Sequence, residues 1–118
     1  MIFLILASVF LGALGQILVK IGATNLELNF AGKNLIISLI SIMRNLPVMC
    51  GIFSYGVSFL MWIKVLSKVE LSYAYPMVSI GYVLIMIFSY FVLKENIGLI
   101  RIIGVFFIII GVVLVAKS

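Results

Sequence analysis

Hydroxyl side chains recur along one long apolar stretch of the sequence, residues 71–95. On a helix with about 100° between successive residues, these side chains fall on one side: Ser72, Tyr75, Ser79, Tyr82, Ser89 and Tyr90. A helix that contacted lipid all round would not need such a stripe. The chemistry open to the stripe is hydrogen bonding, and we expect it to face other helices or a cavity.

Two further apolar stretches carry polar stripes. In residues 2–21 the shared face holds Ser8, Gly12, Gly15 and Gln16, with Lys20 at its margin. In residues 46–66 it holds Gly51, Ser54, Tyr55, Ser58 and Trp62. These faces fit two interpretations: close helix packing through small residues, or the polar wall of a transport pathway. Lys20 lies one turn from its predicted helix end, where an ammonium group can reach the membrane interface.

The residues needed for catalysis or metal binding do not occur together. There is no histidine, and the single cysteine, Cys50, has no partner in the chain. All three acids, Glu27, Glu70 and Glu95, lie at predicted helix ends or between the first two stretches. No nucleophile–base pair, metal cluster or phosphate-binding glycine loop can be assembled from this set. We therefore expect neither an enzyme nor a metal or other cofactor, and the sparse basic residues do not indicate nucleic acid.

Composition places the stripes in a membrane. The 118 residues are 66% hydrophobic and 9% charged, whereas soluble domains are about 45–50% apolar and about 25% charged. A membrane-spanning helix needs roughly 20 residues, and four apolar stretches are of about this length: residues 2–21, 46–66, 71–93 and 99–116. We predict an all-α membrane protein in which residues 1–118 form a single four-helix transmembrane domain surrounded by membrane lipid.

A short amphipathic helix is predicted between the first two spans. Residues 33–44 place apolar side chains at helical spacing between Lys33 and Arg44, namely Leu35, Ile36, Leu39, Ile42 and Met43. This apolar run is too short to cross a bilayer, so we expect the helix to lie at the membrane interface.

The fourth span differs from the other three. Past Arg101 it has no polar side chain until Lys117, and its two glycines, Gly104 and Gly111, share one face. Small residues in such a row favour close helix packing. Because four helices can hardly enclose a solute pathway alone, we expect a dimer with these glycines as contacts. The basic residues are divided too evenly between the two sides to predict an orientation.

Several of these features together resemble a known family. They are the four predicted spans, Gly15–Gln16 with Lys20 four residues on, the run AYPMVSIGYV at 74–83, the Lys94–Glu95 pair and the Gly104/Gly111 helix. This combination resembles the small multidrug resistance superfamily, within the drug/metabolite transporter group that includes the EamA-like proteins. Within it, the chain is most similar to the ArnE/ArnF-type subunits of the undecaprenyl-phosphate-aminoarabinose flippase.

The resemblance separates two branches of the superfamily. Its drug exporters carry a membrane-embedded glutamate in the first helix, and aligning Lys20 with the lysine that ends their helix puts Gly12 at that position. Glycine cannot titrate, so the branch that moves lipid-linked sugars is favoured. The resemblance then implies a flippase that moves a polyprenyl-phosphate-linked monosaccharide across the cytoplasmic (inner) membrane, as a homodimer or as a heterodimer with a paralogous subunit.

The expected binding residues follow from this implied substrate. The isoprenoid tail would stay in lipid while the phosphate is attracted by Lys20, Lys64 or Lys68. The headgroup would pass along the polar stripes, at Gln16, Lys20, Ser54, Tyr55, Ser58, Trp62, Tyr75, Ser79 and Tyr82. Two alternatives stay open: an exporter of a drug, polyamine or metabolite that works without the first-helix glutamate, and a non-transporting membrane subunit. The sugar, the polyprenyl length, the driving force and parallel or antiparallel assembly also stay open.

Overall fold

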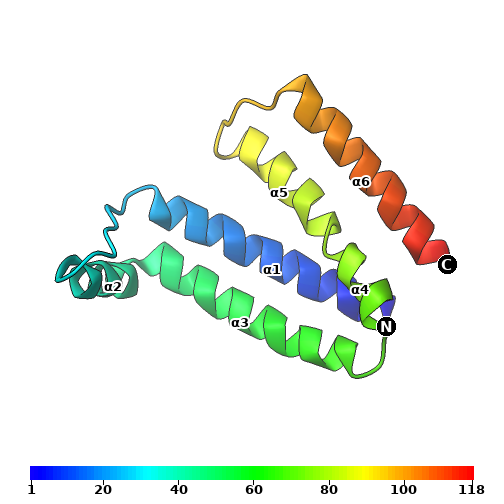
Figure 1. Cartoon of the computed structure of the whole chain (residues 1–118), viewed down its shortest axis with the longest axis horizontal. Helices are drawn as coiled ribbons and strands as arrows, with labels where there is room; N and C mark the ends of the chain where they lie inside the picture. The colour runs from blue at the N-terminus through cyan, green and yellow to red at the C-terminus, as the bar shows by residue number, and fades with distance from the viewer.

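Every regular element of the chain is a helix (Figure 1). The computed structural model describes residues 1–118 and contains no strand. Four segments have the length and apolar composition of membrane spans: α1 (Ile2–Ala23), α3 (Leu46–Leu66), α4 together with α5 (Leu71–Phe91), and α6 (Leu99–Lys117). The prediction of an all-helical chain with four candidate spans is therefore confirmed.

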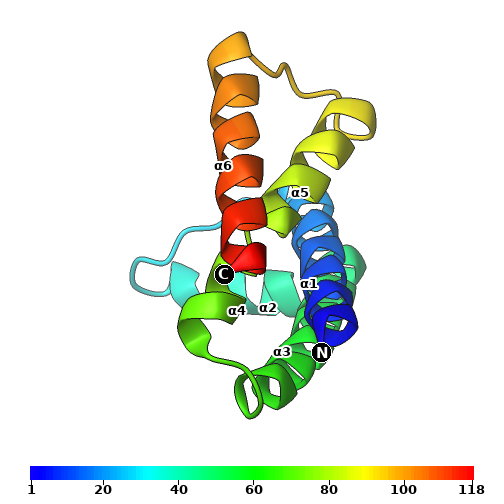
Figure 2. The ribbon, with the colours of Figure 1, turned by 90° about the vertical axis from the view of Figure 1, so that its right-hand side faces the viewer.

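The helices α1 and α3 lie side by side and antiparallel, and their backbones touch (Figures 1 and 2). A methyl group on Gly15 would lie 2.8 Å from the carbonyl oxygen of Gly51, and one on Gly51 would lie 2.6 Å from the carbonyl oxygen of Gly15. Farther along the pair, the Ser58 hydroxyl donates to the carbonyl oxygen of Ser8 at 2.6 Å. Small side chains thus allow the closest helix contact in the molecule.

Asn45 joins the end of α1 to the start of α3. Its Nδ2 donates to the carbonyl oxygen of Gly22 at 3.1 Å, and its Oδ1 accepts the backbone N–H of Val48 at 3.1 Å. The second bond caps α3 at a backbone N–H that has no partner within the helix. Pro47 lies in the first turn, where the N–H that proline lacks would have no helical partner either. One side chain therefore fixes both the start of α3 and its position beside α1.

The third span is divided into two helices, α4 (Leu71–Met77) and α5 (Ile80–Phe91). We expected one helix over residues 71–93. The division follows Pro76, which has no N–H to donate and whose ring crowds the preceding turn. After it, the N–H groups of Val78 and Ser79 donate to the carbonyl oxygens of Tyr75 and Pro76, three residues back, both at 3.0 Å. This tighter turn changes the direction of the chain between α4 and α5.

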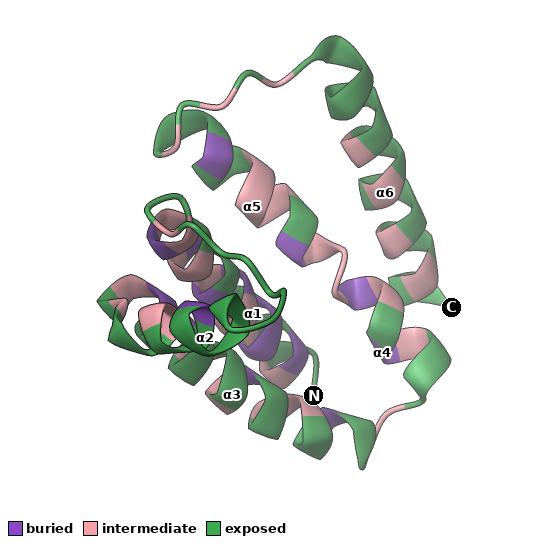
Figure 3. Cartoon of the chain, turned by 60° about the vertical axis from the view of Figure 1, so that its left-hand side comes forward, coloured by how far each residue is buried: buried purple, intermediate pink, exposed green.

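The buried core is small and lies where α1, α3 and α4 meet. It consists of Ile5, Val9, Val65, Ala74 and Met77. Only 16 of the 118 residues are buried, and Figure 3 shows them concentrated away from α6. Most apolar side chains thus face outward, as they do in a protein whose surroundings are lipid.

The helix α6 lies apart from the α1–α3 pair, on the far side of α4 and α5 (Figures 1 and 2). None of its residues is buried. A side chain built on Gly104 or Gly111 would meet no atom within 4 Å. The Tyr73 hydroxyl donates to the carbonyl oxygen of Ala116 at 3.4 Å, which links α4 to the end of α6. Within one chain, the glycine face of α6 therefore has no packing partner.

The short helix α2 (Asn34–Arg44) runs across the ends of α1 and α3 rather than along them (Figures 1 and 2). Its one buried residue is Ser38, whose hydroxyl donates to the Asn29 carbonyl oxygen and accepts the Asn29 backbone N–H, both at 2.9 Å. This pair of bonds holds the segment before α2 against the helix.

The α1–α3 contact gives a stability prediction with a matched control. Gly51→Ala puts a methyl group against the backbone of α1, whereas Gly56→Ala on the same helix meets no atom within 4 Å. We expect Gly51→Ala to lower the free energy of unfolding by about 1–3 kcal/mol, because the two helices must move apart. Gly56→Ala should not lower it, and the higher helix propensity of alanine should raise it by up to about 1 kcal/mol. Denaturant unfolding in lipid or mild detergent measures both, and equal effects would contradict the contact.

Candidate functional site

One large cavity lies between α1, α3, α4 and α5. Its volume is about 870 Å³, within the range of about 300–1,000 Å³ that small-molecule sites occupy. It is lined by Ser8, Val9, Gly12, Ala13, Gln16, Ile17, Lys20, Tyr55, Ser58, Phe59, Trp62, Tyr75, Val78, Gly81, Tyr82, Ile85, Ser89, Leu93 and Glu95. Tyr75 and Tyr82 line the cavity and are still 65% and 56% exposed. The cavity is therefore open on the side where these rings lie.

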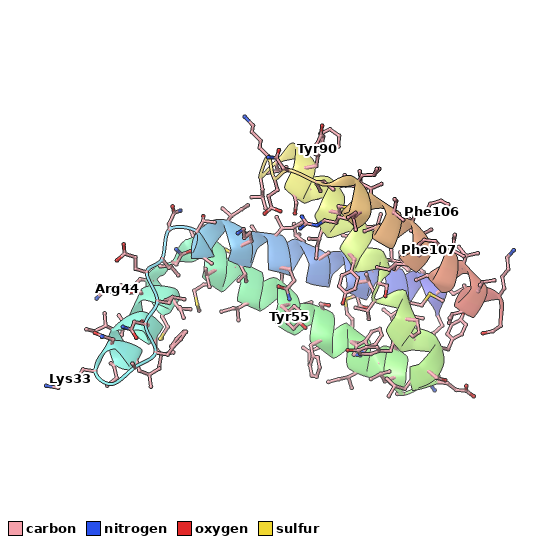
Figure 4. The ribbon with its side chains drawn as sticks, turned by 45° about the horizontal axis from the view of Figure 1, so that its top comes forward. Lys33, Arg44, Tyr55, Tyr90, Phe106 and Phe107 are labelled. Atoms are coloured by element: carbon pink, nitrogen blue, oxygen red, sulfur yellow. The ribbon has the colours of Figure 1, made fainter.

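Most of the residues singled out in the sequence meet at this cavity. Seven of the nine expected headgroup contacts line it, namely Gln16, Lys20, Tyr55, Ser58, Trp62, Tyr75 and Tyr82. They come from α1, α3, α4 and α5, and Figure 4 places Tyr55 on α3, on the stretch that runs beside α1. Three separate stripes of the sequence thus converge on one space.

Four of the expected residues lie outside the lining. Ser54 and Ser79 are half-buried and do not reach the cavity. Ser79 lies at the break after Pro76, where the tighter turn changes the helical spacing from which its face was predicted. Lys64 and Lys68 are exposed at the end of α3. Because α3 is antiparallel to α1, that end lies across the span from Lys20. The geometry therefore leaves Lys20 as the lysine of the cavity.

The stripe on α1 is divided between contact with α3 and the wall of the cavity. Gly15 packs against the backbone of α3. The Ser8 hydroxyl donates to the carbonyl oxygen of Ile5 at 2.9 Å, while the Ser8 carbonyl oxygen accepts from Ser58. Gln16 and Lys20 lie exposed in the cavity wall. Packing uses the small residues, and the longer polar side chains beside them face the open space.

The polar groups of the cavity wall differ in whether they already have a hydrogen-bond partner within the chain. The Ser58 hydroxyl is used in the bond to Ser8. The side-chain hydrogen bonds within the chain involve none of the polar groups of Gln16, Tyr55, Tyr75 and Tyr82. An amide and three phenol groups are therefore free to bond to a ligand or to water.

Glu95 is a cavity residue that the sequence analysis did not select. The helix α5 ends at Phe91, and Lys94, three residues beyond it, has a φ of 56°, in the left-handed region. The backbone N–H of Glu95 then donates to the carbonyl oxygen of Ser89 at 2.9 Å. This turn folds the chain back over α5, so Glu95 lines the cavity while Lys94 lies exposed outside it. Periodicity along the helix could not indicate this, because the residue lies beyond the helix.

The cavity has one cation and one anion, both at the same end of the spans. Lys20 lies in the last turn of α1, and Glu95 follows the end of α5. Both helices end on the same side of the molecule (Figure 1). Neither side chain has an oppositely charged group within 4.0 Å. The rest of the lining is apolar, aromatic or neutral and polar, so the charged groups of the cavity are confined to this end.

Comparison with known proteins connects the chain to membrane transport. The model of the EamA-like transporter family matches residues 1–117. A probable 4-amino-4-deoxy-L-arabinose-phosphoundecaprenol flippase subunit ArnF of Serratia proteamaculans is 33% identical over 112 residues, covering 92% of this chain and 86% of that protein. An ArnE subunit with the same probable function from Pseudomonas fluorescens strain Pf0-1 is 31% identical over 120 residues, covering 99% and 97%.

A second ArnE subunit gives a shorter match. The protein from Pseudomonas fluorescens strain Pf-5 is 37% identical over 67 residues, which are 57% of this chain and 59% of that protein. No solved structure matches the chain. The names of these relatives describe transport subunits rather than enzymes.

The cavity gives a labelling prediction. In a Cys50→Ser background, which removes the one native thiol, Tyr55→Cys places a thiol in the cavity and Phe53→Cys places one on the outer face of the same helix. A maleimide reacts with the thiolate, which needs water to form. We expect a water-soluble maleimide to label Tyr55→Cys faster than Phe53→Cys, on the order of tenfold. Equal rates in liposomes would contradict a hydrated cavity.

Proposed function

The chain belongs to the EamA-like transporter family and is a multi-pass membrane protein, and we propose that it moves a polyprenyl-phosphate-linked monosaccharide across the cytoplasmic membrane. The observation that carries the proposal is the cavity: it lies between candidate membrane spans, has a lysine at one end and free hydroxyl-bearing aromatic rings along its wall, and is open on one side. The names of the ArnE and ArnF relatives support the class of substrate.

The headgroup is proposed to bind at two kinds of contact. Lys20 binds the phosphate, since an ammonium–phosphate pair forms charge-assisted hydrogen bonds that are roughly twice as strong as neutral ones. The sugar lies against Tyr55, Trp62 and Tyr82, whose rings offer flat apolar faces and polar tips. Gln16, next to Lys20 on the same face of α1, offers both a donor and an acceptor to sugar hydroxyls.

The isoprenoid tail is proposed to leave through the open side of the cavity. Tyr75 and Tyr82 lie at this side, and Phe59, which also lines the cavity, is 55% exposed. A tail that remains in lipid costs no desolvation, so only the phosphate and sugar need a polar path. This division is why a small bundle with an open side suits a lipid-linked substrate.

A partner subunit is proposed to pack on α6. Its glycine face is open at Gly104 and Gly111, and the exposed rings of Phe106 and Phe107 extend from the same helix (Figure 4). In lipid, helices associate through such small-residue faces. The partner is a second copy or a paralogous subunit, and the occurrence of two subunit names, ArnE and ArnF, among the relatives supports the second.

The helix α2 is proposed to lie at the membrane interface. It runs across the spans, and its exposed apolar residues are Leu35, Ile36, Ile37, Leu39, Ile40 and Met43. Lys33 precedes the first residue of α2, and Arg44 is its last residue, just before α3 begins (Figure 4). An apolar face in the acyl region with basic ends near anionic headgroups is the arrangement of an interfacial helix.

The binding test compares two classes of ligand. Purified protein in lipid nanodiscs is titrated with a polyprenyl-phosphate monosaccharide and with a quaternary ammonium compound. We expect saturable binding of the lipid-linked sugar, because Gly12 leaves the middle of α1 without an acid and the one acid of the lining, Glu95, lies at an end. Saturable ammonium binding with proton release, and none of the sugar lipid, would overturn the proposal in favour of an exporter.

The role of Lys20 can be tested against lysines outside the cavity. Lys20→Gln should weaken binding of the polyprenyl-phosphate sugar by about tenfold, since it removes one charge-assisted contact to phosphate. Lys64→Gln and Lys117→Gln, at the other side of the spans, should change it by less than about twofold. Similar losses in all three variants would show a general surface attraction and remove Lys20 from the site.

A further inference from the structure

One buried hydroxyl group of the cavity has no hydrogen-bond partner in the chain. Ser89 lies near the end of α5, is 8% exposed and lines the cavity. Its hydroxyl takes part in none of the side-chain hydrogen bonds. No side-chain oxygen or nitrogen sealed inside the protein lacks a partner, so this hydroxyl reaches open space, and the cavity is the space that Ser89 lines. A hydroxyl in this state is available to a ligand.

The carboxylate of Glu95 belongs to the same turn. The backbone N–H of Glu95 donates to the carbonyl oxygen of Ser89 at 2.9 Å, and both residues line the cavity. Lys94 between them is exposed outside the lining, and no cationic group of the chain lies within 4.0 Å of the Glu95 carboxylate. The turn therefore brings an unpaired carboxylate and an unpaired hydroxyl to one end of the cavity.

The end of α5 adds negative potential at this place. The N–H groups of Val92 and Leu93 both donate to the carbonyl oxygen of Phe88, at 2.8 and 3.4 Å. The carbonyl oxygens of Tyr90 and Phe91 accept no backbone hydrogen bond. Free carbonyl groups give a helix C-terminus a partial negative charge, which favours a cation nearby. In secondary transporters, interrupted helix ends of this kind bind sodium ions or protons.

We propose that this end of the cavity binds a sodium ion, with the Glu95 carboxylate and the Ser89 hydroxyl as its side-chain ligands. Carboxylate and hydroxyl oxygens are the ligands that hard cations take. The site has a single carboxylate, which balances a single positive charge. The ion is a co-transported species rather than a resident cofactor, and it would supply a driving force for the transporter.

Lys20 makes the sodium site depend on the phosphate. It lines the same end of the cavity and repels a second cation while its own charge is unpaired. A phosphate bound to Lys20 removes this repulsion, and the sodium ion in turn offsets the repulsion between the phosphate and Glu95. With a phosphodiester, the charges of Lys20, Glu95, phosphate and sodium sum to zero, which suits a site in surroundings of low dielectric constant. This coupling rests on the proposed function, whereas the cation site does not.

Sodium binding is measured directly in the first experiment. Purified protein in phosphatidylcholine nanodiscs, with no polyprenyl lipid, is incubated with radioactive sodium, which is then displaced by unlabelled sodium chloride at constant ionic strength. We expect saturable binding that Glu95→Gln abolishes and that Ser89→Ala weakens by about tenfold, since each removes a ligand.

Two variants serve as matched controls for sodium binding. Glu70 is exposed outside the cavity lining, so Glu70→Gln changes the net charge by the same amount as Glu95→Gln without touching the site. Ser54 is half-buried and also lies outside the lining, so Ser54→Ala removes a hydroxyl elsewhere in the bundle. Both variants should bind sodium as the wild-type chain does.

The second experiment measures the coupling to the lipid. Binding of a polyprenyl-phosphate monosaccharide is compared in sodium chloride and in N-methylglucamine chloride at equal concentration and pH. We expect the lipid to bind about tenfold more tightly in sodium, and saturating lipid to raise the sodium affinity by the same factor, because coupling between two sites is reciprocal. In Glu95→Gln the two salts should give the same lipid affinity. Glu95→Asp, which retains the charge, should keep part of the difference and provides a second variant if Glu95→Gln does not fold.

The outcomes separate the cation site from the proposed function. No saturable sodium binding by the wild-type chain, or unchanged binding in Glu95→Gln, would overturn the cation site and leave the flippase proposal standing. Unchanged sodium binding in Ser89→Ala would remove that hydroxyl from the site, and an equal effect of magnesium chloride on lipid binding would overturn sodium as the ion. Saturable sodium binding without any binding of the polyprenyl lipid would overturn the proposed function and the coupling, and leave the cation site standing.

Discussion

The backbone contact between α1 and α3 is the constraint on which the rest of the arrangement depends. In lipid, apolar side chains gain little by leaving their surroundings, so helices associate through close packing and hydrogen bonds. Gly15 and Gly51 bring the two backbones into contact. Asn45 adds a hydrogen bond at one end of the pair, and Ser58 adds one farther along it. With the small residues of α1 turned to α3, the next residues round the helix, Gln16 and Lys20, face the cavity.

The spans and most of the cavity could be predicted from residue pattern, because a helix of known period maps sequence onto faces directly. Gln16, Tyr55, Ser58 and Tyr82 were found in this way and line one space. The same method failed where the period does not hold. Ser79 lies at the break that follows Pro76, and no residue type at the end of α5 reveals that Lys94 turns left-handed and brings Glu95 to the cavity.

Two surfaces have no packing partner within one chain, the glycine face of α6 and the open side of the cavity. The glycine face of α6 meets nothing, and the cavity is open beside Tyr75 and Tyr82. Phenol groups are costly to leave unbonded in hydrocarbon. Water, a lipid-linked headgroup or a partner subunit at the open side would satisfy them, which is why the proposed substrate and the proposed assembly are linked. The two charged side chains of the lining, Lys20 and Glu95, lie at one end of this space.

The most direct test of the central claim is translocation itself. Liposomes containing a polyprenyl-phosphate monosaccharide in both leaflets are prepared with the protein, alone and together with a paralogous subunit, and a membrane-impermeant reagent is added outside. If the chain forms a flippase for this lipid, the reagent should react over time with the inner-leaflet sugar as well as the outer-leaflet sugar. Reaction confined to the outer-leaflet fraction in both preparations, as in protein-free liposomes, would contradict the account.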